Sequence, residues 1–162
     1  MGSEIQLKSE KSKGSHFFFE LTCPIIKDIE KQEVEKTSNL KTEKLEGKNI
    51  LIAEDNKVNI LILKTILEKE NAFLNITYNG AEALLAAKEN KYDVILMDLD
   101  MPVMNGEVAI KKIREFDINT PIIIITASNS FNIISLKEYN IFSVIRKPFT
   151  ANEIIDTISN VI

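Results

Sequence analysis

The sequence has a single cysteine among its 162 residues, and it has no long uninterrupted hydrophobic run. Cys23 alone excludes an internal disulfide and fits a reducing compartment. No stretch approaches the roughly 20 apolar residues that cross a bilayer, and residues 1–5 show no signal-peptide core. These absences predict a soluble, cytoplasmic segment without membrane contact, with any membrane anchor of a longer parent protein lying upstream of it.

The sequence also has no excess of basic residues. The formal net charge is −4, and 44% of the residues are hydrophobic, which is enough for a packed core. Residues 1–48 carry nine Lys and nine acidic residues, whereas residues 49–162 carry 11 Lys and Arg against 15 acidic residues. An acidic domain without a basic stripe argues against nucleic acid as its direct ligand.

Strand and helix patterns alternate from residue 49 onward. The strand patterns cover residues 48–53, 74–78, 94–97, 121–125 and 141–145. The helical patterns cover residues 56–70, 80–90, 103–116 and 129–139, and a last one begins at residue 150. Continuous apolar strands in five βα units predict an α/β fold, a parallel sheet with helices on both faces. Right-handed crossovers make the doubly wound, flavodoxin-like strand order 2-1-3-4-5 the economical solution.

Polar residues stand where these strands end. Glu54 and Asp55 follow the first strand, and Asp98 follows the third. Because strands one and three are neighbours in this order, the three carboxylates are expected to converge at the topological switch point. Thr126 and Lys147, which end strands four and five, complete the same rim. Asp98 is expected to be presented at this rim rather than buried.

These residue types suit phosphoryl transfer. Three carboxylates within a few Å repel one another and favour a bound cation, and oxygen ligands without His or Cys favour Mg²⁺. With Mg²⁺ held by Glu54 and Asp55, Asp98 is free to act as a nucleophile that is already ionised at pH 7. The ammonium of Lys147 and the hydroxyl of Thr126 can then bind the phosphoryl oxygens.

Four stretches of the chain resemble the receiver domain of two-component signalling. They are Glu54-Asp55-Asn56, Asp98 with Met101 to Gly106 after it, Thr126-Ala127 and Lys147-Pro148-Phe149. The resemblance covers residues 49–162. Asn56, Val58 and Asn59 further resemble the receivers that are fused to histidine kinases.

The resemblance implies a role for each site residue. Asp98 is the phosphoacceptor, Glu54, Asp55 and the backbone carbonyl of Asp100 hold Mg²⁺ with it, Thr126 is the switch hydroxyl, and Lys147 pairs with the phosphoryl group. A cis Lys147–Pro148 bond is also implied, since only a peptide bond before proline adopts the cis form at a small cost in free energy. The implied partner is a phospho-His donor domain, either the receiver's own kinase core or a histidine phosphotransfer protein.

Two positions depart from the receiver pattern. Val144 stands where an aromatic switch residue is usual, and Phe142, the nearest aromatic, is expected to lie in the core. Asp100 places an acid beside the phosphoryl site, where it would either add a metal ligand or change the rate of attack by water.

The first 48 residues predict a separate element. Residues 4–10 and 16–22 are strand-like, and residues 11–15 between them carry a hairpin signal. This run is similar to the end of the ATP-binding domain of histidine kinases. The predicted organisation is therefore a kinase remnant over 1–26, a linker over 27–48 and a receiver over 49–162, with a possible homodimer through the parent kinase.

The helical pattern after Asn56 carries two apolar stripes. Val58, Leu61, Ile62, Thr65 and Ile66 are expected to pack on the sheet. Ile60, Leu63 and Leu67 then lie on the opposite face, where they would dock the donor domain or be covered by residues 1–48.

Three classes of function remain open on the sequence. The first is a phosphoacceptor domain that catalyses its own phosphorylation and dephosphorylation, and the second is a docking module that is not phosphorylated. The third is a haloacid-dehalogenase-type or nucleotide-binding enzyme. The third is disfavoured because no GxxxxGK[ST] loop exists and Met101-Pro102 breaks the DxDx[TV] pattern.

Overall fold

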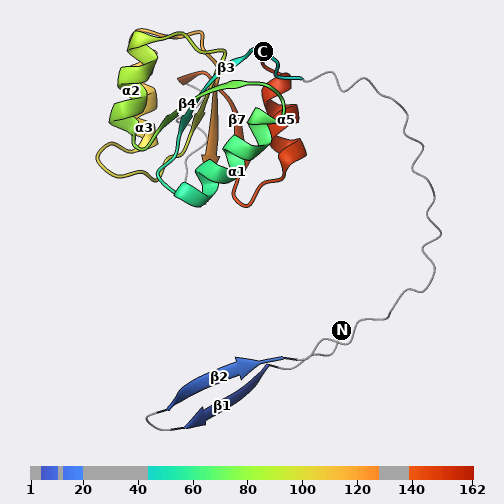
Figure 1. The fold of residues 1–162 in the computed structure, drawn as a ribbon. Coiled ribbons are helices and arrows are strands. Elements are labelled where there is room, and N and C mark those ends of the chain that lie inside the picture. Colours follow the sequence, from blue (N-terminus) through green and yellow to red (C-terminus); the bar gives the residue numbers. More distant parts are fainter. Residues whose placement is uncertain (1–4, 11–12, 20–43, 128–138) are drawn as a thin grey trace, which may run out of the picture. The chain divides into compact units, whose positions relative to one another are not determined.

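The computed structural model describes residues 5–10, 13–19, 44–127 and 139–162 (Figure 1). The chain divides into two compact units, residues 1–40 and residues 41–162. The predicted helix over 129–139, apart from its last residue, and most of the predicted linker lie outside the described residues.

The second unit is built on a five-stranded parallel sheet. Its strands are β3 (Asn49–Ala53), β4 (Phe73–Thr77), β5 (Val94–Met97), β6 (Ile122–Thr126) and β7 (Ile141–Arg146). Their order is β4-β3-β5-β6-β7, which confirms the predicted 2-1-3-4-5 topology. Every residue of β5 and β6 is buried, because a central parallel strand is covered on both faces.

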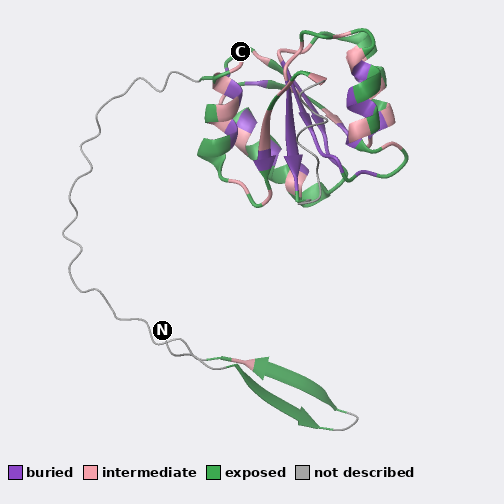
Figure 2. Cartoon of the chain, turned by 180° about the vertical axis from the view of Figure 1, so that it is seen from behind, coloured by how far each residue is buried: buried purple, intermediate pink, exposed green. Residues whose placement is uncertain are grey.

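Helices cover both faces of this sheet. They are α1 (Lys57–Glu68), α2 (Gly80–Glu89), α3 (Gly106–Arg114) and α5 (Ala151–Ser159). α2 and α3 pack on one face, and α1 and α5 pack on the other (Figure 1). Buried residues concentrate on the strands and on the helix faces turned toward them (Figure 2).

Asparagine or threonine caps each helix. The side-chain oxygens of Asn56, Asn79, Asn105 and Thr150 accept hydrogen bonds from backbone N–H groups of the first turn. The cap at Asn105 explains why α3 begins at Gly106, three residues later than the helical pattern at Val103 predicts. The caps also end the loops that follow β3 and β5, where the candidate site lies.

The predicted faces of α1 are reversed except at Ile66, which is half-buried and packs on the core as predicted. Ile60, Leu63 and Leu67 are buried, with exposed fractions of 9%, 1% and 0%. Val58 and Leu61 are instead more than 60% exposed, and Ile62 is 43% exposed. Both stripes have helical spacing, so the spacing alone could not select the inward one. The docking surface predicted at Ile60, Leu63 and Leu67 is therefore wrong.

Phe142 is exposed at 47%, which contradicts its predicted place in the core. The pairing of β6 with β7 shifts register between Ile122 and Ile123, whose partners are Ile141 and Ser143. Phe142 is the extra residue at this irregularity, and a bulge turns a side chain away from the alternation of the strand.

Leu45 belongs to the core, although it falls inside the predicted linker. It is fully buried and packs in the same hydrophobic cluster as Leu67 and Ala72. The turn around it is fixed by the N–H of Gly47, which donates to the carbonyl of Asn71 at 3.1 Å. The second unit therefore begins before residue 49.

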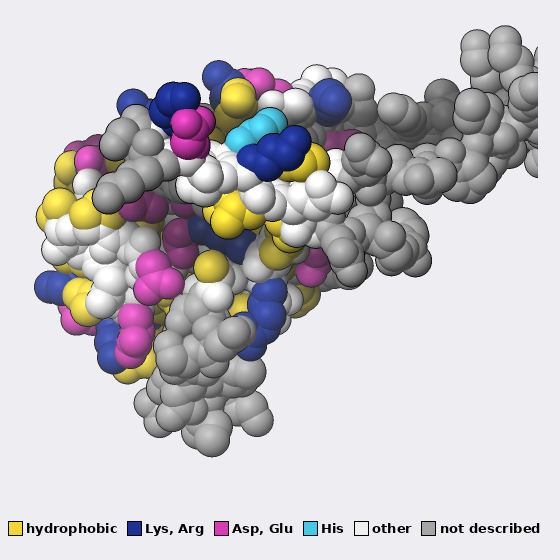
Figure 3. Space-filling view, turned by 90° about the horizontal axis from the view of Figure 1, so that it is seen from below, with side chains coloured by type: hydrophobic (Ala, Val, Ile, Leu, Met, Phe, Trp, Pro, Cys, Tyr) yellow, Lys and Arg dark blue, Asp and Glu magenta, His cyan; other side chains and the backbone are white. Residues whose placement is uncertain are grey.

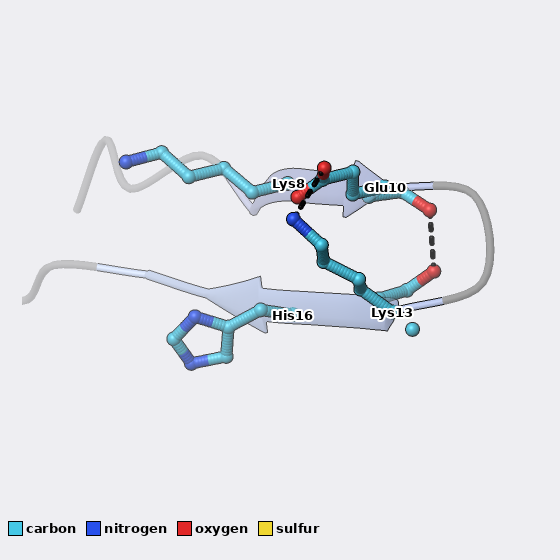
Figure 4. A pocket seen from close by; sticks show the side chains of 7 residues that line it. Lys8, Glu10, Lys13 and His16 are labelled. Carbon is cyan, nitrogen blue, oxygen red and sulfur yellow. Dashed lines mark hydrogen bonds and ion pairs between the residues drawn. The ribbon is translucent and has the colours of Figure 1, made fainter.

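The first unit contains the predicted hairpin. β1 (Gln6–Glu10) pairs antiparallel with β2 (Gly14–Phe18). Next to the turn, the hydroxyls of Ser9 and Ser15 are 2.7 Å apart, and Lys13 pairs with Glu10 at 2.7 Å (Figure 4). β1 ends at Glu10 as predicted, whereas β2 begins two residues earlier than predicted, at Gly14, whose φ of +102° suits the turn.

One face of the hairpin is apolar and exposed. Leu7 lies opposite Phe17, and Ile5 and Phe19 extend the same face. Their exposed fractions lie between 56% and 77%. Figure 4 shows the other face, where Lys8 lies opposite His16. None of the helices in the described ranges is long and apolar enough to cross a membrane.

Candidate active site

The acidic residues meet at the edge where the parallel strands end. Glu54 and Asp55 follow β3, and Asp98 follows the neighbouring β5. One carboxylate oxygen from each residue lies within 4.8 Å of those of the other two. Figure 3 looks onto this edge, where acidic side chains lie next to a basic one in a recess. The predicted convergence of the three carboxylates is confirmed.

Asp98 is buried, whereas the sequence predicts a carboxylate presented to solvent. Only 5% of the residue is exposed. Its backbone N–H donates to the carbonyl of Ala53 at 2.9 Å, which fixes the strand end against β3. Its Oδ2 accepts from Lys147 at 2.6 Å, and its Oδ1 accepts a longer bond of 3.3 Å from the N–H of Asp100. Oδ1 is therefore the freer of the two oxygens.

Lys147 joins two of the carboxylates. Its Nζ donates to Asp98 Oδ2 and to Glu54 Oε2, both at 2.6 Å. Its backbone N–H donates to the carbonyl of Thr126 at 3.0 Å, and the following Lys147–Pro148 bond is cis, as predicted. Burial acts to lower the pKa of Lys147, but the hydrogen bonds and charges of Asp98 and Glu54 outweigh it and raise that pKa.

Glu54 is held more tightly than the sequence suggests. It is 1% exposed, and its Oε1 accepts from the backbone N–H of Asn56 at 3.2 Å and from Asn59 Nδ2 at 3.0 Å. The sequence pattern predicts no site role for Asn59. The available signal was its spacing, because it lies one helical turn after the cap residue Asn56.

Thr126 and Asp100 occupy the same edge. Thr126 ends β6 and is 1% exposed, and β6 lies between β5 and β7, which lead to Asp98 and Lys147. The side chain of Asp100 is exposed, and its backbone N–H contacts Asp98. Both residues lie where the sequence predicts them.

The loop after Asp98 packs closely on the strand end. Gly106 donates its N–H to the carbonyl of Leu99 at 3.0 Å. A Cβ atom at Gly106 would lie 2.0 Å from the backbone oxygen of Asp98, so no larger residue fits. Val103, in the same loop, is 88% exposed and has a φ of 65°, which is costly for a β-branched residue.

The donor set fits a hard divalent cation. Three carboxylates face one ammonium in this cluster, so two negative charges stay uncompensated. The described part of the cluster offers only oxygen donors, the ligands that Mg²⁺ prefers. Asp55 is exposed at the mouth of the cluster, where an ion can enter from solvent.

The usual switch aromatic has no counterpart at its own position. Val144 is half-buried and packs against the hydrophobic cluster beneath α2 and α3. Phe142 is exposed at the bulge, on the strand that leads to Lys147. An aromatic side chain does lie on this strand, but on its solvent side.

Two of the curated relatives are sensor proteins much longer than this chain. The sensor kinase/phosphatase LuxQ of Vibrio vulnificus is 39% identical over 127 residues, which are 76% of this chain and 14% of LuxQ. The sensory/regulatory protein RpfC of Xanthomonas campestris is 28% identical over 188 residues, covering 99% of this chain and 26% of RpfC. The chain thus spans a small part of the relatives it matches.

Solved receiver domains have the same fold. A response regulator receiver from Francisella is 32% identical with a TM-score of 0.66, and the match covers 71% of this chain and 96% of that one. The receiver of sensor histidine kinase PA1611 from Pseudomonas aeruginosa is 28% identical with a TM-score of 0.66, covering 71% and 97%. The latter was solved with a magnesium ion coordinated in its active-site cleft.

The family assignment rests on most of the chain. Residues 50–159 match the family described as the response regulator receiver domain. This range contains the five strands of the sheet except Asn49, the first residue of β3, and it contains each acidic, hydroxyl and lysine residue of the site. The chain therefore belongs to the response regulator receiver domain family.

Proposed function

We propose that this chain accepts a phosphoryl group on Asp98 in a Mg²⁺-dependent step. The observation that carries the proposal is the cluster itself, in which a buried carboxylate lies 2.6 Å from an ammonium and next to two further carboxylates. A carboxylate oxygen attacks the phosphorus of a phospho-His donor, the P–N bond breaks, and the imidazole leaves with its electron pair and takes up a proton. An acyl phosphate on Asp98 is the product.

The residues of the chain have distinct parts in this step. Glu54, Asp55 and Asp98, with the backbone carbonyl of Asp100, would hold Mg²⁺, which when bound offsets negative charge on the phosphoryl oxygens. Lys147 already contacts Asp98 and would keep its ammonium next to the transferred group. Thr126 would donate its hydroxyl to a phosphoryl oxygen. Oδ1 of Asp98, which has the weaker hydrogen bond, is the better placed nucleophile.

Intact mass spectrometry tests this function. The chain is incubated with Mg²⁺ and acetyl phosphate, and one added phosphoryl group is expected. Asp98→Ala should abolish the addition. Asp93→Ala is the matched control, because Asp93 precedes the same strand and its carboxylate accepts from the N–H of Asn49 at the opposite edge. An unmodified parent chain would instead support the docking module that is not phosphorylated. Modification that persists in Asp98→Ala would overturn Asp98 as the phosphoacceptor.

The chain is further proposed to be part of a hybrid sensor histidine kinase in the cytoplasm. The similarity to RpfC extends over 99% of the chain and thus includes the hairpin, which the family match at residues 50–159 leaves out. The exposed apolar face at Leu7 and Phe17 suits a hairpin that completes an upstream domain. Residues 1–26 would then be the end of the ATP-binding domain.

The gene upstream of Met1 tests this origin. We expect an open reading frame that continues upstream of Met1 and encodes an ATP-binding domain and a phosphorylatable His. An in-frame stop codon shortly before Met1 would contradict the hybrid-kinase origin. Phosphorylation of Asp98 by acetyl phosphate does not depend on this result.

The donor is proposed to dock on the exposed face of α1. Val58, Leu61 and Ile62 form an apolar stripe on the helix that begins directly after Glu54 and Asp55. A helical phospho-His domain could cover this stripe and bring its imidazole to the acidic edge. Either the chain's own kinase core or a histidine phosphotransfer protein fits this description.

A charged substitution in the apolar stripe of α1 can distinguish an effect on donor docking from an effect on phosphoryl transfer itself. Leu61→Glu should slow transfer from a phosphorylated histidine phosphotransfer domain while leaving phosphorylation by acetyl phosphate unchanged. Ile118→Glu is the control, since Ile118 is 66% exposed in the loop between α3 and β6, at the opposite edge of the sheet. Equal transfer rates for Leu61→Glu and Ile118→Glu would overturn docking at α1.

A further inference from the structure

The carboxylate of Glu54 is fixed by three hydrogen-bond donors. Lys147 Nζ binds Oε2 at 2.6 Å. The backbone N–H of Asn56 and Nδ2 of Asn59 both bind Oε1, at 3.2 Å and 3.0 Å. Glu54 is 1% exposed, so these donors take the place of water around its charge.

Asn59 reaches Glu54 because of the way α1 begins. The side chain of Asn56 caps the helix by accepting from the N–H groups of Val58 and Asn59, at 2.9 Å and 3.4 Å. This cap sets the phase of the helix, and Asn59 lies four residues before the buried Leu63. Residues four apart share a helix face, so the amide of Asn59 is turned toward the sheet and the end of β3.

Helix stability gives no reason for an asparagine at this position. Within a helix Asn is less favourable than Ala. The side chain is half-buried, and its amide is used on Glu54. A hydrogen bond to a buried carboxylate is stronger than one between neutral groups, which offsets the poor propensity.

The bond from Asn59 bears on the whole acidic cluster. Lys147 divides its ammonium between Glu54 and Asp98 at equal distances of 2.6 Å. Without the amide, Oε1 of Glu54 would keep only the longer bond from Asn56, and the carboxylate could turn and draw Lys147 away from Asp98. The orientation of one carboxylate therefore sets how the charge of Lys147 is shared.

We propose that Asn59 is a positioning residue that orients Glu54 and thereby raises the affinity of the acidic cluster for Mg²⁺. This inference rests on the proposed function, because it assigns Mg²⁺ to the cluster of Glu54, Asp55 and Asp98. Groups that orient metal-binding carboxylates change metal affinity by about tenfold or more when they are replaced.

Calorimetric titration with Mg²⁺ tests the proposal in the full chain. Asn59→Leu keeps about the size of the side chain but removes the donor without adding a charge, and it should weaken Mg²⁺ binding by at least about tenfold. Asn59→Ala should weaken it by several-fold. Asn152→Leu is the matched control, because Asn152 is an exposed residue in the first turn of α5 and loses the same amide. Its Mg²⁺ affinity should equal that of the parent.

A second background shows whether the effect passes through Glu54. In Glu54→Gln, the further change Asn59→Ala should alter Mg²⁺ affinity by less than about twofold, since the two residues are coupled. Urea unfolding of Asn59→Ala without Mg²⁺ provides an independent check on folding. A purely structural role for Asn59 predicts unchanged Mg²⁺ affinity in both variants.

The possible failures are distinguishable. If the parent binds Mg²⁺ and Asn59→Leu binds it equally well, the role of Asn59 is overturned and the proposed function stands. An equal loss from Asn59→Ala in the parent and in Glu54→Gln would also overturn it. A parent chain that binds no Mg²⁺ would overturn the metal-dependent function itself.

Discussion

Lys147 and Asp98 are 49 positions apart in the sequence, yet Lys147 Nζ lies 2.6 Å from Asp98 Oδ2. The ion pair spans the sheet from the end of β7 to the end of β5, and the backbone of Lys147 is tied to Thr126 between them. The proposed nucleophile is thus also part of a buried charge cluster. Changes at the site should alter stability and chemistry together.

Lys147→Met should destabilise the fold by about 3–5 kcal/mol, because it leaves two buried carboxylates without their ammonium. Urea unfolding without Mg²⁺ measures the effect. Lys64→Met is the control, since Lys64 pairs with Glu68 on the surface of α1 at 3.6 Å and should cost less than about 1 kcal/mol. Equal losses in the two variants would contradict a special role for the Lys147 pair.

The stability that Lys147 contributes should vanish in alkali. Its pKa in the folded chain is raised above the ordinary 10.5. The folded state therefore binds the proton more tightly, and this contribution is complete below pH 10.5 and is lost as pH rises through the folded pKa. The difference in unfolding free energy between parent and Lys147→Met should be constant near neutral pH and shrink above pH 10.5. A difference that grows there would have the wrong sign.

Gly106→Ala should displace the loop after Asp98, because the new Cβ would lie 2.0 Å from the backbone oxygen of Asp98. We expect a loss of about 3 kcal/mol in urea unfolding and slower phosphorylation by acetyl phosphate. In the control Gly47→Ala, the φ of +71° costs about 1 kcal/mol but no atom lies within 4 Å of the added Cβ. Phosphorylation should stay normal in that control.

Val103→Asn should stabilise the fold by about 1 kcal/mol, since Asn tolerates the φ of 65° that is costly for Val. Val103 is 88% exposed, so little packing is lost. Thermal unfolding measures the gain. Val108→Asn, an equal exchange within the regular helix α3, should bring no gain, and equal effects at the two positions would contradict relief of backbone strain.

Asp100→Asn should lengthen the life of the phosphorylated state. The backbone N–H of Asp100 contacts Asp98, so the exposed Asp100 carboxylate lies close to the phosphoacceptor. From there it can accept a proton from an attacking water. We expect about tenfold slower hydrolysis, less than a buried general base contributes. Loss of the added phosphate is followed by mass, with Asp93→Asn as the control. Unchanged hydrolysis together with weaker Mg²⁺ binding would identify the side-chain carboxylate of Asp100 as a metal ligand instead.

The sheet and the acidic cluster could be predicted because both follow from the order of the elements. Buried apolar strands that alternate with helices imply parallel pairing, and parallel strands bring their last residues to one edge. Glu54, Asp55 and Asp98 meet for this reason alone. The burial of Asp98 could not be predicted in this way, because it depends on how Lys147 packs over it.

Hydrophobic periodicity alone does not show which face of α1 is buried, because that depends on tertiary contacts. Two stripes of similar character compete, and Val58, Leu61 and Ile62 stay outside. The bond from Asn59 to Glu54 and the cap at Asn56 fix the phase of the helix. Phe142 was misplaced for a related reason, since a one-residue bulge in the pairing of β6 with β7 cannot be seen in hydrophobic alternation.

Because Leu45 is part of the core, the folded domain begins before the first residue that matches the receiver family. The family match begins at residue 50, but a fully buried leucine five positions earlier fills the space beside Leu67 and Ala72. A fragment cut at the family boundary would carry an open cavity at the end of α1, of the kind that costs about 2–5 kcal/mol in a protein core. Where a receiver is separated from its parent protein, the safe point of separation lies before Lys41, at the boundary between the two units.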